Sequence, residues 1–323
     1  MKEKHFWETI WLTGLERAKV SQIRSDDSYH IVQPLKHKEL INIDLINDPV
    51  WVNTMEEALN SKVPSIAFEY WMEQGWLVHA LPEISNLWGR PQPALYHPEI
   101  DTGIHAMMVI DRAAYNNASV DARWAALCHD FGKSITPIEK LPSHICHEIK
   151  GVPLVERRIE KWGFSEERKE LLLKATEHHG TMHNIDKFKP LSIINFVEKL
   201  NFKSPKMLKD FCDVVAADDQ GRKTFFNNQP RNTTLLIEIV NLLESMNLDS
   251  YIENDLVLWE AKKTQMRTLD NYSESWFTEH SKNKFMEKRK QFNLYSEINN
   301  LIKKHAVSNN INITNKKTEK AKL

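Results

Sequence analysis

Glycine is scarce in this sequence, and its scarcity excludes two common nucleotide-binding motifs. The 323 residues include only 9 glycines, which are widely separated. A dinucleotide fingerprint needs a Gly-x-Gly-x-x-Gly run, because the backbone must approach the pyrophosphate closely, and no such run is present. A P-loop ending in the Gly-Lys-Ser of residues 132–134 would need a second glycine at position 127, which is Leu127. The sequence therefore predicts neither of these nucleotide folds.

Cysteines and long apolar runs are also few. The three cysteines, Cys128, Cys146 and Cys212, are too sparse for a disulfide framework or a cysteine zinc site, and they predict a reducing, cytoplasmic location. No apolar run approaches the ~20 residues that span a bilayer. The charged start, MKEKHFWETI, does not have the apolar core of a signal peptide. We therefore expect no membrane partner.

Neither sign of charge is in excess. The chain has 43 Lys and Arg residues against 44 Asp and Glu residues, a formal net charge of −1. This balance removes any argument for strong non-specific binding of nucleic acid by the whole chain, although a local basic face remains open. Residues 282–304 have a modest basic excess, which we interpret as a solvated helix face rather than a polyanion contact.

Apolar residues recur with helical rather than alternating spacing, which predicts an all-α fold. Residues 104–114 are typical of a helix capped by Asp101 or Thr102. The next helix should begin with Asp121 as its cap and continue through Cys128 towards the helix breaker Gly132. Prolines in 81–99 indicate a loop, and we expect Trp71, Trp76 and Trp88 to pack in a core. Further helices are predicted at 154–162, 165–177, 190–200, 205–217 and 233–246.

Histidines gather in one part of the chain. Of the 14 in the sequence, eight lie between positions 97 and 183, namely His97, His105, His129, His144, His147, His178, His179 and His183. With Asp130 and Asp218 they form a donor set suited to zinc or a divalent first-row metal, since no cysteine spacing supports sulfur ligation. We interpret His97 as a loop residue rather than a metal ligand. His144 and His178 each lie close in sequence to a better candidate for a metal ligand.

The pentapeptide HDFGK, at 129–133, is the most informative motif. Neighbouring residues of a helix differ by ~100° in direction, so His129 and Asp130 could chelate one ion only from its flank. We expect the following residues, Phe131-Gly132-Lys133, to relax the backbone here. Lys133 adds a cation one turn later, either for a bound phosphate or for interaction with the helix dipole.

Several segments together resemble a known family. They are LPEISNLWGRPQPALYHPEIDTGIHAMMVIDRAA, DARWAALCHDFGKSITP, LPSHICHE and HHGTMH, and the similarity runs over roughly 53–225. The chain resembles the HD-domain metal-dependent phosphohydrolases, and in particular the HD body of bacterial multifunctional CCA-adding tRNA nucleotidyltransferases. This resemblance implies an HD-type helical bundle with a helical neck and a helical C-terminal segment. The expected divisions are 1–48 (unassigned), 49–96 (neck-like), 97–225 (HD domain), 226–302 (C-terminal helices) and 303–323 (disordered tail).

The resemblance also implies a site and an activity. The metal-binding positions of the family correspond to His105, His129, Asp130 and Asp218, with nickel, magnesium or manganese as the expected ion. The family's activities are 2′,3′-cyclic phosphodiesterase, 2′-nucleotidase and phosphatase, on ribonucleotides or RNA ends. We expect His147 and His179 to hold a second ion or phosphate, or to protonate the leaving ribose oxygen, and Lys133 to stabilise developing charge. His183 and Arg222 are expected beside the substrate.

Two departures from the family pattern leave alternatives open. Nothing before Trp51 supplies the glycine-rich, acidic nucleotidyltransferase head, so CCA addition is not expected of this chain alone, although a head-bearing partner chain is conceivable. The family's EADxRGR reads AADDQGR here, with Ala216 and Gln220 replacing an acid and an arginine. The alternatives are an RNA-binding module for tRNA without catalysis, and a hydrolase of nucleoside triphosphates or signalling nucleotides. The oligomeric state stays open.

Overall fold

The computed structural model describes residues 2–35, 43–245, 283, 287, 288, 290 and 293–306. Within these residues the regular structure is helical, and the one β-type pairing is an isolated bridge between Pro91 and Asp101. The all-α prediction is therefore confirmed. No helix in the described part of the chain combines the length and apolar character that crossing a bilayer requires. The chain divides into two compact units, the first comprising 1–183 and 202–233 and the second 184–201 and 234–323.

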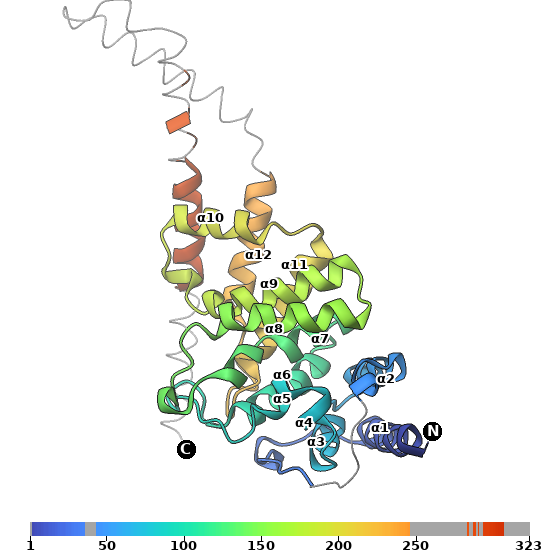
Figure 1. Cartoon of the computed structure of the whole chain (residues 1–323). Coiled ribbons are helices and arrows are strands. Elements are labelled where there is room, and N and C mark those ends of the chain that lie inside the picture. Colours follow the sequence, from blue (N-terminus) through green and yellow to red (C-terminus); the bar gives the residue numbers. More distant parts are fainter. Residues whose placement is uncertain are drawn as a thin grey trace, which may run out of the picture. The chain divides into compact units, whose positions relative to one another are not determined.

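The first unit begins with a group of helices, which Figure 1 shows together. Buried tryptophans form the core between them. Trp7, Trp11, Trp51, Trp71 and Trp76 are at most 1% exposed, and neighbouring rings lie 4.7–5.5 Å apart. Large buried rings contribute most of the apolar area in such a core, so core packing, as predicted, is confirmed. The helices are α1 (Lys2–Val20), α2 (Pro49–Asn60), α3 (Ser65–Glu73), α4 (Leu77–Ala80) and α5 (Pro82–Ser85).

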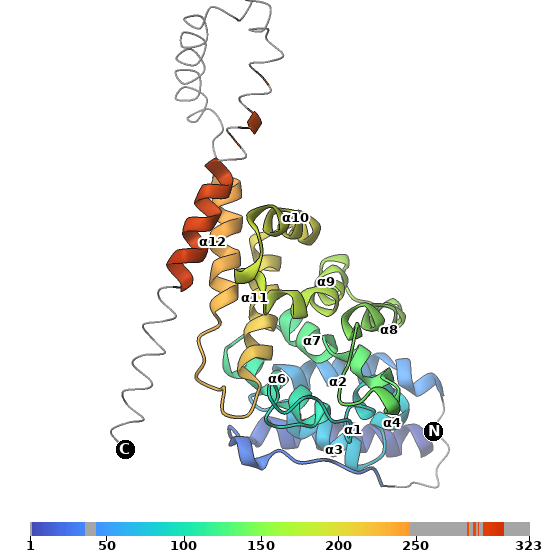
Figure 2. The ribbon, with the colours of Figure 1, turned by 90° about the vertical axis from the view of Figure 1, so that its left-hand side faces the viewer.

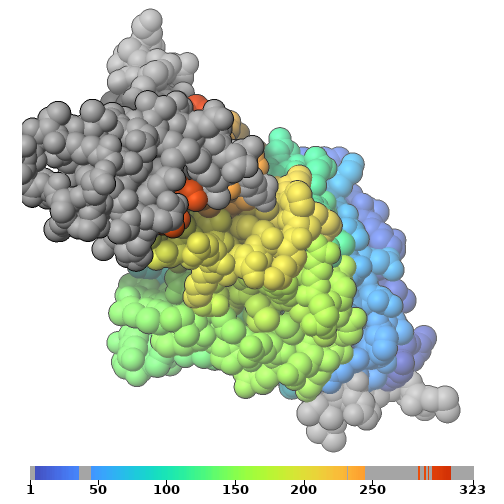
Figure 3. Space-filling view, turned by 90° about the horizontal axis from the view of Figure 1, so that it is seen from above, coloured from blue at the N-terminus to red at the C-terminus, as the bar shows by residue number. Residues whose placement is uncertain are grey.

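The rest of the first unit positions the histidines. Its helices are α6 (Thr102–Tyr115), α7 (Val120–Cys128), α8 (His147–Trp162), α9 (Glu166–Met182) and α11 (Pro205–Gln220). Figure 2 shows α6 and α7 inside this group, and Figure 3 shows the α9 segment on the surface of the unit. Asp101 caps α6 as predicted, accepting from the backbone N–H groups of Gly103 and Ile104.

Two helix starts differ from the sequence prediction. Ser119, not Asp121, caps α7, because the Ser119 hydroxyl accepts from Ala122 N while the Asp121 carboxylate pairs with Arg168. Helix α8 starts at His147 rather than 154 and continues through Pro153, which is exposed. His147 therefore belongs to the first turn of a helix.

The second unit contains α10 (Pro190–Leu200) and most of α12 (Arg231–Ser245). The bounds of α10 are those predicted. Residues 293–306 are also helical, so this helix continues past 303, where we expected the disordered tail to begin. Residues 307–323, much of the 226–302 segment and a smaller part of 282–304 lie outside the described residues.

Candidate metal centre

The His129-Asp130 pair lies where a helix ends. Helix α7 ends at Cys128, and His129 still has helical angles (φ −53°, ψ −35°), whereas Asp130 has left them (φ −105°, ψ 14°) before the 3₁₀ turn η3 (Phe131–Ile135). The change of direction turns both side chains toward the same centre. Two consecutive residues within a helix would reach one ion only from its flank, but Asp130 has left the helix, so this restriction does not apply here.

Gly132 is required by close packing rather than by an unusual backbone angle. It is not among the glycines with positive φ. A Cβ at this position would lie 2.7 Å from the backbone nitrogen of Gly151 and 2.8 Å from the carbonyl carbon of His147, and closer still to the His147 oxygen. The α-helix does give way here to the 3₁₀ turn η3, and the missing side chain of Gly132 lets η3 touch the start of α8. This contact places His147 beside Asp130.

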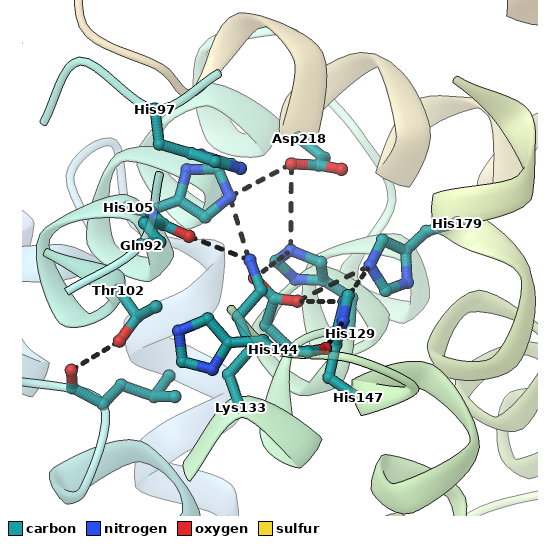
Figure 4. Close-up of polar contacts among 12 residues, drawn as sticks. Gln92, His97, Thr102, His105, His129, Lys133, His144, His147, His179 and Asp218 are labelled. Carbon is teal, nitrogen blue, oxygen red and sulfur yellow. Dashed lines mark hydrogen bonds and ion pairs between the residues drawn. The ribbon is translucent and has the colours of Figure 1, made fainter. Parts of the chain in front are cut away.

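Four imidazoles have the same orientation. The Nδ1 atoms of His129, His147 and His179 lie 2.7, 2.9 and 3.0 Å from the backbone oxygens of Ala126, His144 and Ala175, and His105 Nδ1 lies 3.2 Å from Gly221 O. Since a carbonyl oxygen can only accept, each Nδ1 carries a hydrogen, and the Nε2 atoms of His129, His147 and His179 present lone pairs. Figure 4 shows these four rings gathered around one centre. Backbone contacts of this kind orient metal-binding histidines.

Asp130 is at the middle of this arrangement. Its Oδ1 lies 3.2 Å from His147 Nε2 and 3.5 Å from His179 Nε2. Its Oδ2 lies 3.3 Å from His129 Nε2 and 3.8 Å from His105 Nε2. The two oxygens thus face different histidine pairs, and the carboxylate could bridge two adjacent subsites.

Asp218, from α11, closes the cluster on the other side. Its Oδ1 lies 3.0 Å from His105 Nε2 and 3.9 Å from His129 Nε2, and its Oδ2 lies 3.0 Å from His183 Nε2. Arg222 Nη2 lies 3.2 Å from the same His183 nitrogen. The structure therefore brings together His105, His129, Asp130 and Asp218, the four positions that the resemblance implied, with His183 and Arg222 next to them.

The donor set fits a divalent cation. His147 Nε2 and His179 Nε2 are 3.3 Å apart, and both present lone pairs, a repulsive arrangement that a cation between them relieves. His129 Nε2 and Asp130 Oδ1 are buried and have no hydrogen-bond partner. Donor atoms of His105, His129 and Asp130, and those of Asp130, His147 and His179, each lie within 4.8 Å of one another. Nitrogen and oxygen ligands of this kind suit zinc and divalent first-row metals.

The electrostatics of the cluster also favour a cation. Burial opposes the charged form of the Asp130 carboxyl, but Lys133 and His129 outweigh it and hold its pKa well below the usual range. Burial likewise opposes the charge of His105, yet hydrogen bonds to Asp218 and Glu99 raise its pKa to about 9. The carboxylates therefore keep a proton on a fully buried imidazole. A divalent ion would compete with that proton.

Lys133 faces inward, against Asp130. Its Nζ lies 2.7 Å from Asp130 Oδ2 and 3.0 Å from the side-chain oxygen of Gln92, and the residue is 6% exposed. It is therefore not an exposed cation at a helix end. His144 lies outside the cluster, because its ring nitrogens contact Thr136 Oγ1 and Pro91 O.

Sequence reasoning missed Glu99, which supports His105 from behind. The side chain of Glu99 is 1% exposed, and its Oε1 lies 3.2 Å from His105 Nδ1 and 2.9 Å from His97 Nδ1. Its Oε2 accepts from the backbone N–H of Lys223. Burial opposes its charge, but hydrogen bonds from His105 and His97 outweigh it and lower its pKa. Nothing in the sequence indicated this role, because Glu99 lies in the segment interpreted as a proline-rich loop.

Comparison with known proteins agrees with this geometry. Residues 102–243 match the HD domain family. Together with the His/Asp cluster, this match indicates a metal-dependent hydrolase. The chain is also similar to part of each of several proteins named "Multifunctional CCA protein". That of Methylobacillus flagellatus is 36% identical over 203 residues, which are 62% of this chain and 49% of that protein.

Two further relatives have the same name. That of Nitrosospira multiformis is 38% identical over 179 residues, 55% of this chain and 43% of that protein. That of Polaromonas naphthalenivorans is 34% identical over 206 residues, 64% of this chain and 48% of that protein. The family resemblance is confirmed, and the chain spans about half the length of the curated relatives it matches.

Proposed function

We propose that the chain is a metal-dependent phosphohydrolase for phosphoesters of ribonucleotides or RNA ends, most specifically a 2′,3′-cyclic phosphodiesterase and phosphatase. The observation that carries this proposal is the buried convergence of His105, His129, Asp130 and Asp218, with Lys133 against the same carboxylate. The names of the relatives support an association with RNA or nucleotides.

The four converging residues would hold one divalent ion. His147 and His179 would hold a second, because their Nε2 atoms face Asp130 Oδ1, and that orientation favours the ligand role over protonation of a leaving group. When bound, such ions polarise a phosphoryl oxygen and lower the pKa of bound water. Asp130 fixes the spacing of the two subsites through its two oxygens.

The substrate would enter where the cluster is least covered. The side chains of His183, His147 and Arg222 are 28%, 15% and 12% exposed, whereas those of Asp130 and Asp218 are 2% and 3% exposed. Burial opposes the charge of His183, but its hydrogen bond to Asp218 raises its pKa to about 9, so it is cationic at neutral pH. His183 and Arg222 would then orient a phosphate at this edge, and Lys133 would stabilise the charge on its oxygens.

The decisive experiment is an assay on 2′,3′-cyclic nucleotides with nickel, manganese or magnesium. It would compare the full chain with Asp130→Ala and with a matched control, Asp213→Ala, which removes a surface carboxylate paired with Lys209. We expect Asp130→Ala to lose activity and bound metal and the control to keep both. Equal activity in wild type and Asp130→Ala would refute the proposal.

A second candidate, RNA binding without catalysis, is favoured by one local observation. Gln220, which replaces an arginine of the family pattern, is engaged with Asn116 and the backbone of Asn228, and Ala216 offers no carboxylate. This candidate predicts tRNA binding that is unchanged by chelation of metal, and no turnover of any phosphoester. A panel that includes nucleoside triphosphates would also separate the remaining substrate classes.

A further inference from the structure

A second polar pocket lies within the first unit, apart from the metal cluster. It is a cavity of about 30 Å³ formed by the segment after α1, the last turns of α6 and the turn after α11. Gly221 lies between the two sites, because it lines this cavity and its carbonyl oxygen accepts from His105 Nδ1. The volume suffices for a small polar group but not for a whole nucleotide.

Arg112 is the unusual member of this pocket. It is 3% exposed, and its guanidinium lies over the Phe226 ring and 5.0 Å from the centre of the Tyr115 ring. Its Nη2 is buried without a hydrogen-bond partner, and no carboxylate among the described residues lies within ion-pair distance. Stacking on aromatic rings offsets part of the cost of burying a cation, but it leaves Nη2 without an acceptor.

The carboxylates that line the pocket are already engaged. Asp111 accepts from Tyr29 OH, at 2.8 Å, and from both the backbone N–H and the hydroxyl of Ser65. Asp26 accepts from Thr224 N at 2.8 Å. Neither forms an ion pair with Arg112. Burial lowers the pKa of the Arg112 guanidinium, and the charge of Asp26 opposes this lowering.

The cationic side chains of the pocket differ in whether they have an ion-pair partner. Arg24 is paired with the buried Glu69, with 2.8 Å between Arg24 Nη1 and Glu69 Oε1. Lys62 is exposed and forms no ion pair within the described part of the chain. Within the described residues, Arg112 inside the pocket and Lys62 at its edge thus form no ion pair, while the Asp26 and Asp111 carboxylates line the same cavity.

We propose that this pocket binds one phosphate group, with Arg112 as the principal donor and Lys62 as a second positive charge. A guanidinium fork makes strong charge-assisted hydrogen bonds to phosphate oxygens, and the cavity has room for about two of those oxygens. The phosphate could be free inorganic phosphate or a backbone phosphate of RNA. The second source is geometrically reasonable, because Arg112 is seven residues after His105 on α6, on nearly the same helix face and about 10 Å further along it.

The test uses the full chain freed of metal by chelation and dialysis, so that metal-bound phosphate does not contribute. Binding of inorganic phosphate and of a short single-stranded RNA is measured by calorimetry for wild type, Arg112→Met and a control, Arg157→Met, which changes an exposed arginine of α8. We expect Arg112→Met to weaken binding about tenfold or more and the control to leave it unchanged. Loss for both ligands identifies a free-phosphate site, and loss for RNA alone identifies a backbone contact.

Two results would overturn the proposal. One is the absence of binding of either ligand to wild type, and the other is equal binding by wild type and Arg112→Met. If Arg112→Met does not fold, Lys62→Met decides the question, because an exposed lysine can be replaced without disturbing the core. Unchanged affinity of Lys62→Met for both ligands would then exclude the site. The result does not depend on the proposed hydrolase activity, since no metal and no turnover are involved.

Discussion

Replacing Gly132 with alanine should disable the metal centre through the backbone. The added Cβ would meet Gly151 N at 2.7 Å and the carbonyl group of His147, whereas ordinary contacts begin at 3.4 Å. These are backbone atoms of α8, so no side-chain rotation relieves the clash. The 3₁₀ turn that follows Asp130 and the start of α8 must separate.

The size of the effect follows from these distances. Bringing the Gly151 contact to 3.4 Å requires a movement of at least 0.7 Å, and the contact with the His147 oxygen requires more. Overpacking of this kind typically costs about 1–3 kcal/mol of stability. The movement also displaces His147 from Asp130, and a misplacement of ~1 Å at a reacting centre can reduce the rate about 100-fold.

The assay compares Gly132→Ala with wild type and with Gly180→Ala by urea unfolding, metal content and hydrolysis of a 2′,3′-cyclic nucleotide. Gly180, in α9, is the matched control, because its added Cβ would meet only the side chain of Glu148, which can turn aside. We expect Gly132→Ala to lose stability and bound metal, and Gly180→Ala to keep both. A Gly132→Ala protein with unchanged stability and metal affinity would refute the reasoning.

Three further predictions concern the metal centre. Glu99→Gln should weaken metal binding about 10- to 100-fold in a metal titration, because the carboxylate behind His105 is lost. The control Glu139→Gln, which changes an exposed position, should leave the metal affinity unchanged. Equal metal affinities of Glu99→Gln and wild type would contradict the role assigned to Glu99. In the metal-free protein, burial opposes the charge of His105 and His183, but hydrogen bonds to Asp218 raise both pKa values to about 9 from 6.5. The stabilisation of the folded protein by these two protonated histidines is complete below pH 6.5 and is lost as the pH rises through about 9. A free energy of unfolding, measured in urea, that stays constant over this pH range would contradict the prediction. Chelation should lower the unfolding midpoint, since an ion at 100 times its Kd adds about 2.7 kcal/mol, and an unchanged midpoint would argue against a resident ion.

Sequence patterns determined the fold class and the bounds of several helices. Helical periodicity gave the bounds of α10 and nearly those of α6, because a buried face repeats at each turn. Asp101 caps the start of α6, and Pro190 marks the start of α10. The starts of α7 and α8 were not predictable in the same way. The carboxylate of Asp121 pairs with Arg168 instead of capping its own helix, and Pro153 lies inside a helix.

The candidate ligands were identified by residue type and resemblance, but only the tertiary structure decided their geometry. A sequence does not show that Asp130 turns its two oxygens toward different histidines, or that Gly132 is small to admit α8. Glu99 and Arg112 had no sequence signal at all, because the role of a carboxylate or a guanidinium depends on which groups from distant segments surround it. Periodicity is a local property of the chain, whereas the environment of a buried charge is created by folding.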